Sequence, residues 1–205
     1  MPEIDLSALA GADSAWAVWV LPVLLGLGLA SATGLRTFLP LLMLAGAARF
    51  GLFGIDLNAQ MAWLTSDAAI MALGIAAVVE FTGDKIPVVD NALSTLGLIT
   101  RPVAGAVAAG SVFAGVDPTT AAVAGVIIGA PTALAFNAAQ GGARLTSTAT
   151  TGGLGNPVLS FLEDILAVFT VILSFLAPIL VPILLIVLAV VVFRLARRLR
   201  RPRPA

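Results

Sequence analysis

Two groups of carboxylates interrupt long apolar stretches of this sequence, and they are the residues best able to do chemistry. The first group lies within positions 80–90, and the second is the adjacent pair at 163–164. A charge at the centre of a membrane costs about 2.5–3.5 kcal/mol on insertion scales, so charges in such stretches usually mark a binding site or a pathway. The chemistry they predict is the binding of a cation or the transfer of a proton.

Glu80 and Asp84 are four residues apart, so on a continuous helix they share a face. Lys85 and Asp90 follow across a Gly–Pro turn. The functional interpretation is a coordinating or proton-carrying cluster near a broken helix end. The alternative is an ordinary loop at the membrane surface, with Lys85 paired to a neighbouring acid. Glu80 fits that alternative least, because the apolar residues 76–79 precede it.

Glu163 and Asp164 are about 100° apart on a helix, so they cannot point the same way. We expect one of them to line a cavity and the other to pair with a basic residue of another segment: Arg144, Arg101 or Lys85. The alternative is that both complement the dipole at a helix start. Their position six and seven residues after Pro157 weakens that alternative, which makes this pair the strongest site candidate.

Two further sets of polar residues are candidates. Asn137, Gln140 and Arg144 form one helical stripe that would present amides and a fixed cation, suited to an anion or a buried carboxylate. The segment 146–156 carries hydroxyls and glycines that can replace a hydration shell or bind a phosphate, and we select from it Thr148, Thr151 and Asn156. The alternatives are a polar helix end for the stripe and a flexible loop for the segment, although the segment lacks the charges of a solvated loop.

Composition identifies the class of protein. Hydrophobic residues make up 60% of the 205 positions and charged residues 11%, whereas soluble domains carry about 25% charged residues. The fold class is therefore an all-α polytopic membrane protein. A spanning helix needs about 20 apolar residues, which leaves room for roughly five to seven transmembrane or half-membrane helices, some of them broken or re-entrant.

The absence of Cys, His and Tyr excludes several kinds of chemistry. Disulfides, thiolate or imidazole metal sites, and catalysis by a Cys or His nucleophile are all ruled out. A bound metal would have to be a hard cation held by oxygen atoms. We expect no cofactor.

The charge distribution predicts domains and topology. We expect an acidic leader at 1–15, one helical membrane domain at 16–193 and an Arg-rich tail at 194–205. The tail places the C-terminus in the cytoplasm by the positive-inside rule, and the acidic leader suggests an N-terminus outside. The number of full crossings is then odd, five or seven. A juxtamembrane arginine tail also contacts anionic lipids and does not indicate nucleic-acid binding.

Apolar runs and turn residues predict the helices that position these groups. The expected segments are 16–34, a short 41–48, 68–82 capped by Ser66 or Asp67, a short 91–100, one starting at Pro102, 119–140 with a kink at Pro131, and 158–177 and 179–197 as a hairpin. The alternative for the last two is one long helix bent at its prolines. Small residues such as Gly105 and Gly110 provide faces for close helix contact.

Five motifs carry a resemblance to a known family. They are GLRTFLPLL at 34–42, AARFG at 47–51, DKIPVVD at 84–90, RPVAG at 101–105 and STATTGGLGNP at 147–157. Together they resemble a bacterial integral-membrane family catalogued as a domain of unknown function, DUF4126, over roughly residues 25–200. The resemblance implies a small inner-membrane protein and no substrate or catalytic residue.

The leading hypothesis is a carrier or channel in which the four acids at 80, 84, 163 and 164 handle a cation or proton. Arg101 and Arg144 would balance their charge. The runner-up is a binder or flippase of lipid phosphate that uses Arg36, these two arginines and the helix start after Asn156. Hydrolysis by Asp84 and Asp164 ranks third, so we expect no enzyme, and a structural role remains open. Membrane lipids and a second copy of the chain are the expected partners.

Overall fold

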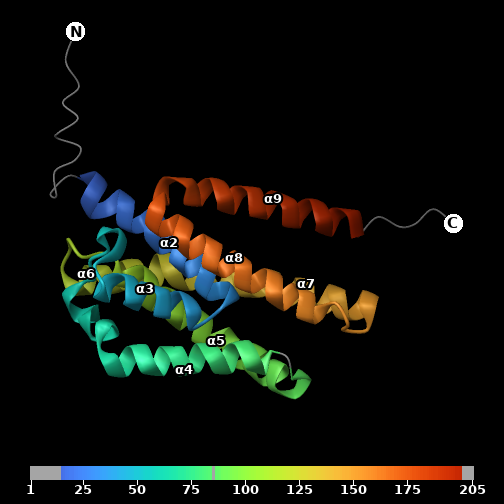
Figure 1. Ribbon diagram of the computed structural model, residues 1–205. Helices are drawn as coiled ribbons and strands as arrows, with labels where there is room; N and C mark the ends of the chain where they lie inside the picture. The colour runs from blue at the N-terminus through green and yellow to red at the C-terminus, as the bar shows by residue number, and fades with distance from the viewer. Residues whose placement is uncertain (1–14, 85, 200–205) are drawn as a thin grey trace, which may run out of the picture.

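The structure is a computed structural model that describes residues 15–84 and 86–199, and its elements there are all helical (Figure 1). In chain order they are η1 (Trp16–Val20), α2 (Leu21–Leu35), α3 (Leu39–Arg49), η2 (Leu52–Gly54), η3 (Ala59–Thr65), α4 (Asp67–Gly83), α5 (Pro87–Ser111), α6 (Pro118–Ala124), η4 (Gly125–Gly129), α7 (Ala130–Thr151), α8 (Asn156–Leu176), η5 (Pro178–Leu180) and α9 (Val181–Leu199).

Four helices in the described part are long and apolar enough to cross a membrane: Trp16–Leu35, Leu93–Ser111, Pro118–Thr151 and Asn156–Leu176. The helices η3 and α4, which meet at 64°, make a fifth if they count as one broken span. Two shorter apolar helices accompany them, α3 and the segment Pro178–Val191. The chain is therefore a polytopic helical membrane protein, and a count of five full crossings requires the bent pair.

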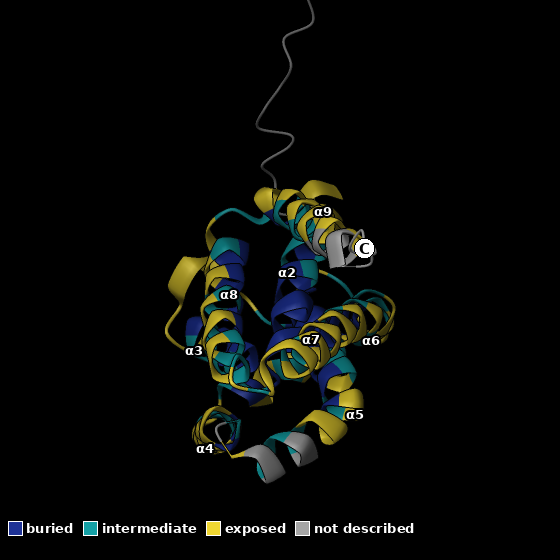
Figure 2. Cartoon of the chain, turned by 90° about the vertical axis from the view of Figure 1, so that its right-hand side faces the viewer, coloured by how far each residue is buried: buried dark blue, intermediate teal, exposed yellow. Residues whose placement is uncertain are grey.

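Helix α2 lies at the centre of the bundle. Residues 28–37 are buried without a break, and Figure 2 shows α2 surrounded by the other helices. A helix that is apolar all round is stable only when neighbours cover every face. As a consequence Arg36, the first residue after α2, lies inside the protein.

Glycines let three helices approach closely around α2. A Cβ on Gly125 or Gly129 would collide with the backbone of α5 at Ala106 and Gly105. A Cβ on Gly34 would likewise collide with the backbone of α7. Small residues at such contacts are how membrane helices pack without a hydrophobic driving force. The predicted packing faces at Gly105 and Gly110 are confirmed.

The prediction for residues 83–101 is wrong. In place of a polar turn, a short helix and a new helix at Pro102, the structure has one helix, α5, with Pro102 inside it. Its start is Pro87, whose missing N–H costs nothing at a first helical position. Membrane helices tolerate an internal proline because neighbouring groups satisfy the freed carbonyl.

The helix predicted at 119–140 is longer and is interrupted by a π-helical turn. That turn, η4, ends two residues before Pro131, where the kink was expected. Residues 146–151, predicted as a loop, form the last turns of α7 instead. Their hydroxyls bond to carbonyls one turn back, as in Thr146 to Gly142 O at 2.9 Å and Thr151 to Ser147 O at 2.8 Å, so a helix satisfies them.

The other predicted helices are confirmed. Ser66 caps α4 by accepting a hydrogen bond from the Ala69 amide at 3.2 Å, which decides between the two predicted caps. Helix α3 has only 11 residues, as its short apolar run predicts. Helices α8 and α9 form a hairpin at Pro178, and α9 runs back along the bundle toward the end where α7 finishes (Figure 1).

Candidate functional site

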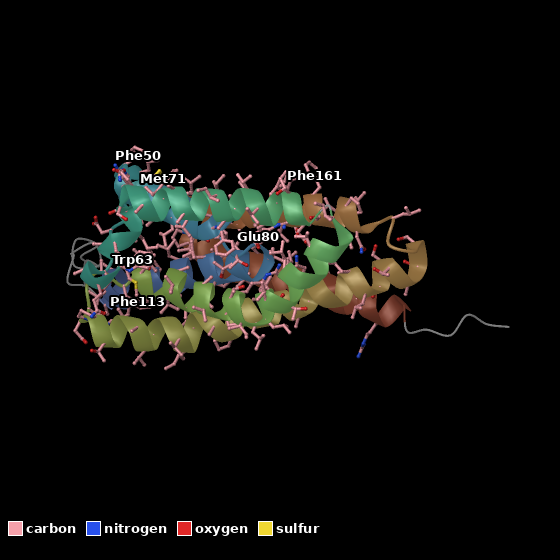
Figure 3. All side chains as sticks on the ribbon, turned by 90° about the horizontal axis from the view of Figure 1, so that it is seen from below. Phe50, Trp63, Met71, Glu80, Phe113 and Phe161 are labelled. Carbon is pink, nitrogen blue, oxygen red and sulfur yellow. The ribbon has the colours of Figure 1, made fainter. Side chains whose placement is uncertain are left out.

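Five of the long segments bring polar side chains together in the half of the bundle nearer the ends of α2 and α4. We call this group the polar network: Arg36, Glu80, Asp84, Asp90, Arg101, Asn137, Gln140, Arg144, Ser160, Glu163 and Asp164. In Figure 3 Glu80 lies among the helices, whereas Met71 and Phe161 lie at the periphery. The network is thus inside a protein whose outer surface is apolar.

Arg36 is the centre of one half of the network. Its side chain is only 2% exposed, and its Nη1 pairs with Asp84. Its Nε lies 2.5 Å from Asp164 Oδ1, and its Nη2 donates to Ser160 Oγ at 2.7 Å. One guanidinium therefore joins the end of α2 to α4 and α8. From the sequence we expect Arg36 only in the lipid-binding alternative, although an arginine directly after an unbroken apolar helix is a signal for burial.

Arg144 is the centre of the other half. Its Nη1 lies 2.5 Å from Asp90 Oδ1, and its Nη2 lies 2.7 Å from Glu163 Oε2 and 3.3 Å from Asp84 Oδ2. Asp84 therefore bridges both arginines. The predicted pairing of one α8 acid with Arg144 is confirmed for Glu163. Asp164, about 100° away on the helix, pairs with Arg36 instead.

Glu80 bonds to the backbone at the start of α3. Its carboxylate accepts hydrogen bonds from the backbone amides of Thr37 at 2.8 Å and Phe38 at 3.2 Å. These amides precede α3, and the first amides of a helix have no partner within it. A carboxylate there also complements the helix dipole. Glu80 thus anchors the start of a half-length helix, which explains why a carboxylate follows a run of Ala and Val.

Arg101 differs from the other two arginines because its acceptors are neutral. Its Nη1 donates to Gly34 O at 3.1 Å, to Asn137 Oδ1 at 2.7 Å and to Gln140 Oε1. Within the described part of the chain no carboxylate lies at ion-pair distance, and its buried Nε has no hydrogen-bond partner. Gln140 then donates to Glu163 Oε2 at 2.5 Å. The predicted inward stripe is confirmed, and it connects Arg101 to Glu163.

The described network holds more negative than positive charge. Three arginines face five carboxylates, so its formal charge is −2 when every group is ionised. Lys85, another predicted site residue, lies outside the described residues. Among the described residues no group of three potential ligands is arranged to hold a metal ion. Guanidinium groups stand between the carboxylates where a metal would have to bind.

Three predicted site residues do not join the network. Thr148, Thr151 and Asn156 lie at the turn between α7 and α8 and bond to their own surroundings. Thr151 Oγ1 accepts from the Gly155 amide at 3.0 Å, and Asn156 Nδ2 donates to Thr148 Oγ1 at 3.1 Å. Together with Gly152, which has φ of 63°, they stabilise a tight turn.

A cavity of about 490 Å³ adjoins the network between α3 and α4. Arg36, Glu80 and Asp164 line it together with apolar residues of both helices. Asp164 is the most exposed of the three, with 17% of its side chain accessible. Asp164 lines the cavity, as predicted for one of the two acids, but it also pairs with Arg36, so the predicted division into one paired acid and one cavity-lining acid is confirmed only in part.

A family model described as "Domain of unknown function (DUF4126)" matches residues 23–198. The chain belongs to the DUF4126 family. The matched span contains the whole polar network, α2 except for its first two residues, and helices α3 to α8. Comparisons of this DUF4126 protein with curated proteins and with solved structures give no match. Its function has to be argued from the network itself.

Proposed function

We propose that this DUF4126 protein is a small transport protein, a carrier or channel, that moves a proton or a cation through its membrane. The observation that carries the proposal is the polar network, in which, among the described residues, five carboxylates outnumber three arginines inside an apolar bundle. Ionisable groups at such positions are expensive and are usually kept for a pathway. An excess of buried negative charge selects for cations over anions.

The arginines offer less to an anion. Arg36 and Arg144 are already paired with two and three carboxylates, and Arg101 has three neutral acceptors. A phosphate would have to displace these partners. The helix start at Asn156, which the lipid-phosphate alternative needs, belongs to the α7–α8 turn, where the Asn156 amide donates to Thr148 Oγ1. The cation interpretation is therefore the stronger one.

A cation that passes through the bundle must open the network. The pairs Arg36–Asp164 and Arg144–Glu163 both join α8 to another helix, so separating them frees α8 carboxylates. A proton or cation that neutralises one of these carboxylates weakens its hold on the arginine. In this proposal the two ion pairs form the gate, and Asp164, which faces the cavity, is the first carboxylate to bind the proton or cation.

A second cavity, of about 350 Å³, lies at the opposite end of the bundle. Most of its lining is apolar, and Ser174 of α8 and Asp56 are its polar members. Ser174, Thr170 and Glu163 all lie on the buried face of α8, and Glu163 is about 16 Å along the helix from Ser174. The hydroxyls donate to carbonyls of their own helix, which leaves their oxygens free to accept. These groups support a route that reaches both faces of the membrane.

The proposed orientation follows from the arginines of α9. Arg194 and Arg197 lie in its last turns, at the end of the bundle where α7 also finishes (Figure 1). By the positive-inside rule this end faces the cytoplasm, which places the network in the cytoplasmic half of a bacterial inner membrane and the N-terminus outside. Paired-aspartate hydrolysis has weaker support, because Asp84 and Asp164 meet on the Arg36 guanidinium instead of on a shared proton.

Thermal stability of the purified protein in nanodiscs tests this proposal. The panel contains Na⁺, K⁺, Mg²⁺, Ca²⁺, a series of pH values, inorganic phosphate and anionic lipids. A ligand present at 100 times its Kd stabilises the folded state by about 2.7 kcal/mol. We expect one cation, or a proton, to raise Tm in the wild type and to lose that effect in Asp164→Asn.

The matched control is Asp67→Asn, which removes an exposed carboxylate at the other end of α4 and should keep the response. Stabilisation by phosphate-bearing lipids alone, lost in Arg144→Gln, would overturn the proposal in favour of the lipid-phosphate alternative.

A further inference from the structure

The cavity between α3 and α4 combines an apolar wall with a charged end. Its wall is formed by leucines of α3 and by small and apolar residues of α4, among them Gly74 and Phe81. Its charged end is formed by Arg36, Glu80 and Asp164. A space with this division suits a molecule that has an apolar part and a polar head.

The apolar wall continues along α4 beyond this cavity. A second, neighbouring cavity shares Gly74 and Val78 and extends to Met71. From Met71 to Phe81 the helix rises about 15 Å, which accommodates an extended hydrocarbon tail. Met71, Ile75 and Val78 are more than 60% exposed on this face, so in a bilayer it is open to lipid.

The charged end of the cavity presents a carboxylate to a bound molecule. Arg36 is 2% exposed and held by Asp84 and Ser160, and Glu80 is bonded to the amides before α3. Asp164 is the accessible group. Its Oδ1 also pairs with Arg36 Nε at 2.5 Å, and 17% of its side chain is accessible. The excess negative charge of the described network and this partly accessible carboxylate favour a positively charged head.

We propose that the cavity binds an amphipathic cation, a molecule with one apolar tail and an ammonium head, which enters from the bilayer between α3 and α4 and places its ammonium on Asp164. This inference rests on the proposed transport function and names its substrate class. An ammonium group suits the site better than a metal ion, because no three ligands converge in the described part of the chain. Its tail occupies the wall along α4.

The test measures saturable binding of tritiated dodecylamine, which is an ammonium ion at neutral pH, to the protein in phosphatidylcholine nanodiscs. Dodecanol and dodecyl sulfate, which have the same tail, compete for the site. We expect the amine to bind about tenfold more tightly than the alcohol, because only the amine pairs with a carboxylate. Equal binding of amine and alcohol, or tighter binding of the sulfate, overturns the proposal.

Two variants locate the site. Asp164→Asn should reduce the affinity for dodecylamine about tenfold and leave that for dodecanol unchanged. Gly74→Leu fills the wall of the cavity, and a Cβ at this position meets no atom within 4 Å, so the fold should tolerate it. It should abolish binding of both amine and alcohol. Gly46→Leu is the matched control, since Gly46 is also helical and open but lies outside the cavity. Equal binding by the two glycine variants overturns the proposal.

Failure of this inference is distinguishable from failure of the transport proposal. Flux of protons or Na⁺ without preferential amine binding would support the transport proposal and contradict the proposed amphipathic substrate. Amine binding that depends on Asp164 and Gly74, without flux of any cation, would support the binding site and contradict the transport proposal.

Discussion

The two ends of α4 hold an arginine–aspartate pair each, in opposite environments. At its start Asp67 pairs with Arg49 at 2.6 Å, and their side chains are 79% and 37% exposed. After its end Asp84 pairs with Arg36, and these side chains are 5% and 2% exposed. The same two residue types therefore make a surface contact at one end and part of a buried network at the other.

The comparison shows that burial, and not the pairing itself, determines how much such a pair contributes to the free energy of unfolding. An exposed ion pair contributes about 0–1 kcal/mol, because water and salt screen it. A buried pair costs several kcal/mol in desolvation, and removing one partner leaves an unpaired charge buried away from water. A buried pair that contributes little net stability is retained for another reason, and here we propose that the reason is transport.

The largest expected effect comes from removing one partner at each end. Arg36→Ala should destabilise the protein by about 3–5 kcal/mol, because Asp84 and Asp164 then lose a buried counter-ion. Arg49→Ala should cost about 0–1 kcal/mol. Reversible unfolding in bicelles measures both. Equal losses of stability in the two variants would contradict the claim that the buried pair and the exposed pair differ in their effect on stability.

An intermediate effect is expected from the caps of the two helices that meet near η3. Glu80→Leu leaves the two amides before α3 without an acceptor inside the protein, which should cost about 2 kcal/mol. Ser66→Ala removes the exposed cap of α4 and should cost about 1 kcal/mol. The same unfolding assay compares them, and Glu80→Gln, which keeps an acceptor oxygen, should fall below Glu80→Leu. A neutral Glu80→Leu would show that Glu80 does not anchor α3.

The smallest effect concerns Asp117, which caps α6 and lies just before the spanning segment Pro118–Thr151. Hydrogen bonds, first from the Thr120 hydroxyl and then from the backbone amides of Thr120 and Thr119, lower its pKa below the ordinary 3.8. Because the folded pKa is depressed, the stabilisation is present above the unfolded pKa and is lost as pH falls through the folded pKa. As the pH falls from about 5 to below 3.8, the wild type should lose a small increment of Tm that Asp117→Asn lacks. Identical pH profiles would contradict this.

Much of the fold could be predicted from residue type and spacing. Apolar runs predict the membrane helices, and the separation of Asn137, Gln140 and Arg144 predicts the stripe that faces inward. The helical phase of Glu163 and Asp164 predicts that they point in different directions. These are local properties of one helix, and a sequence displays them directly.

The remaining errors concern contacts between distant segments. Arg36 is central because α2 is surrounded on every side, and Glu80 is a cap because α3 starts beside α4. The hydroxyls at 146–151 are the exception, because their partners are carbonyls of the preceding turn of the same helix. Pro102 continues α5 because the neighbouring helices and the membrane stabilise it. Neither the packing nor the membrane is visible in local spacing.

The most direct test of the central claim is cation flux into proteoliposomes that contain the wild type, Asp164→Asn or Asp67→Asn, with a pH-sensitive dye for protons and radiolabelled Na⁺ and dodecylamine for cations. We expect flux of at least one of these above that of empty liposomes in the wild type and in Asp67→Asn. Asp164→Asn, still folded, should reduce it about tenfold or more, because the accessible carboxylate of the network is gone. Equal flux in all three proteins, or none above empty liposomes, would contradict a cation path through the polar network.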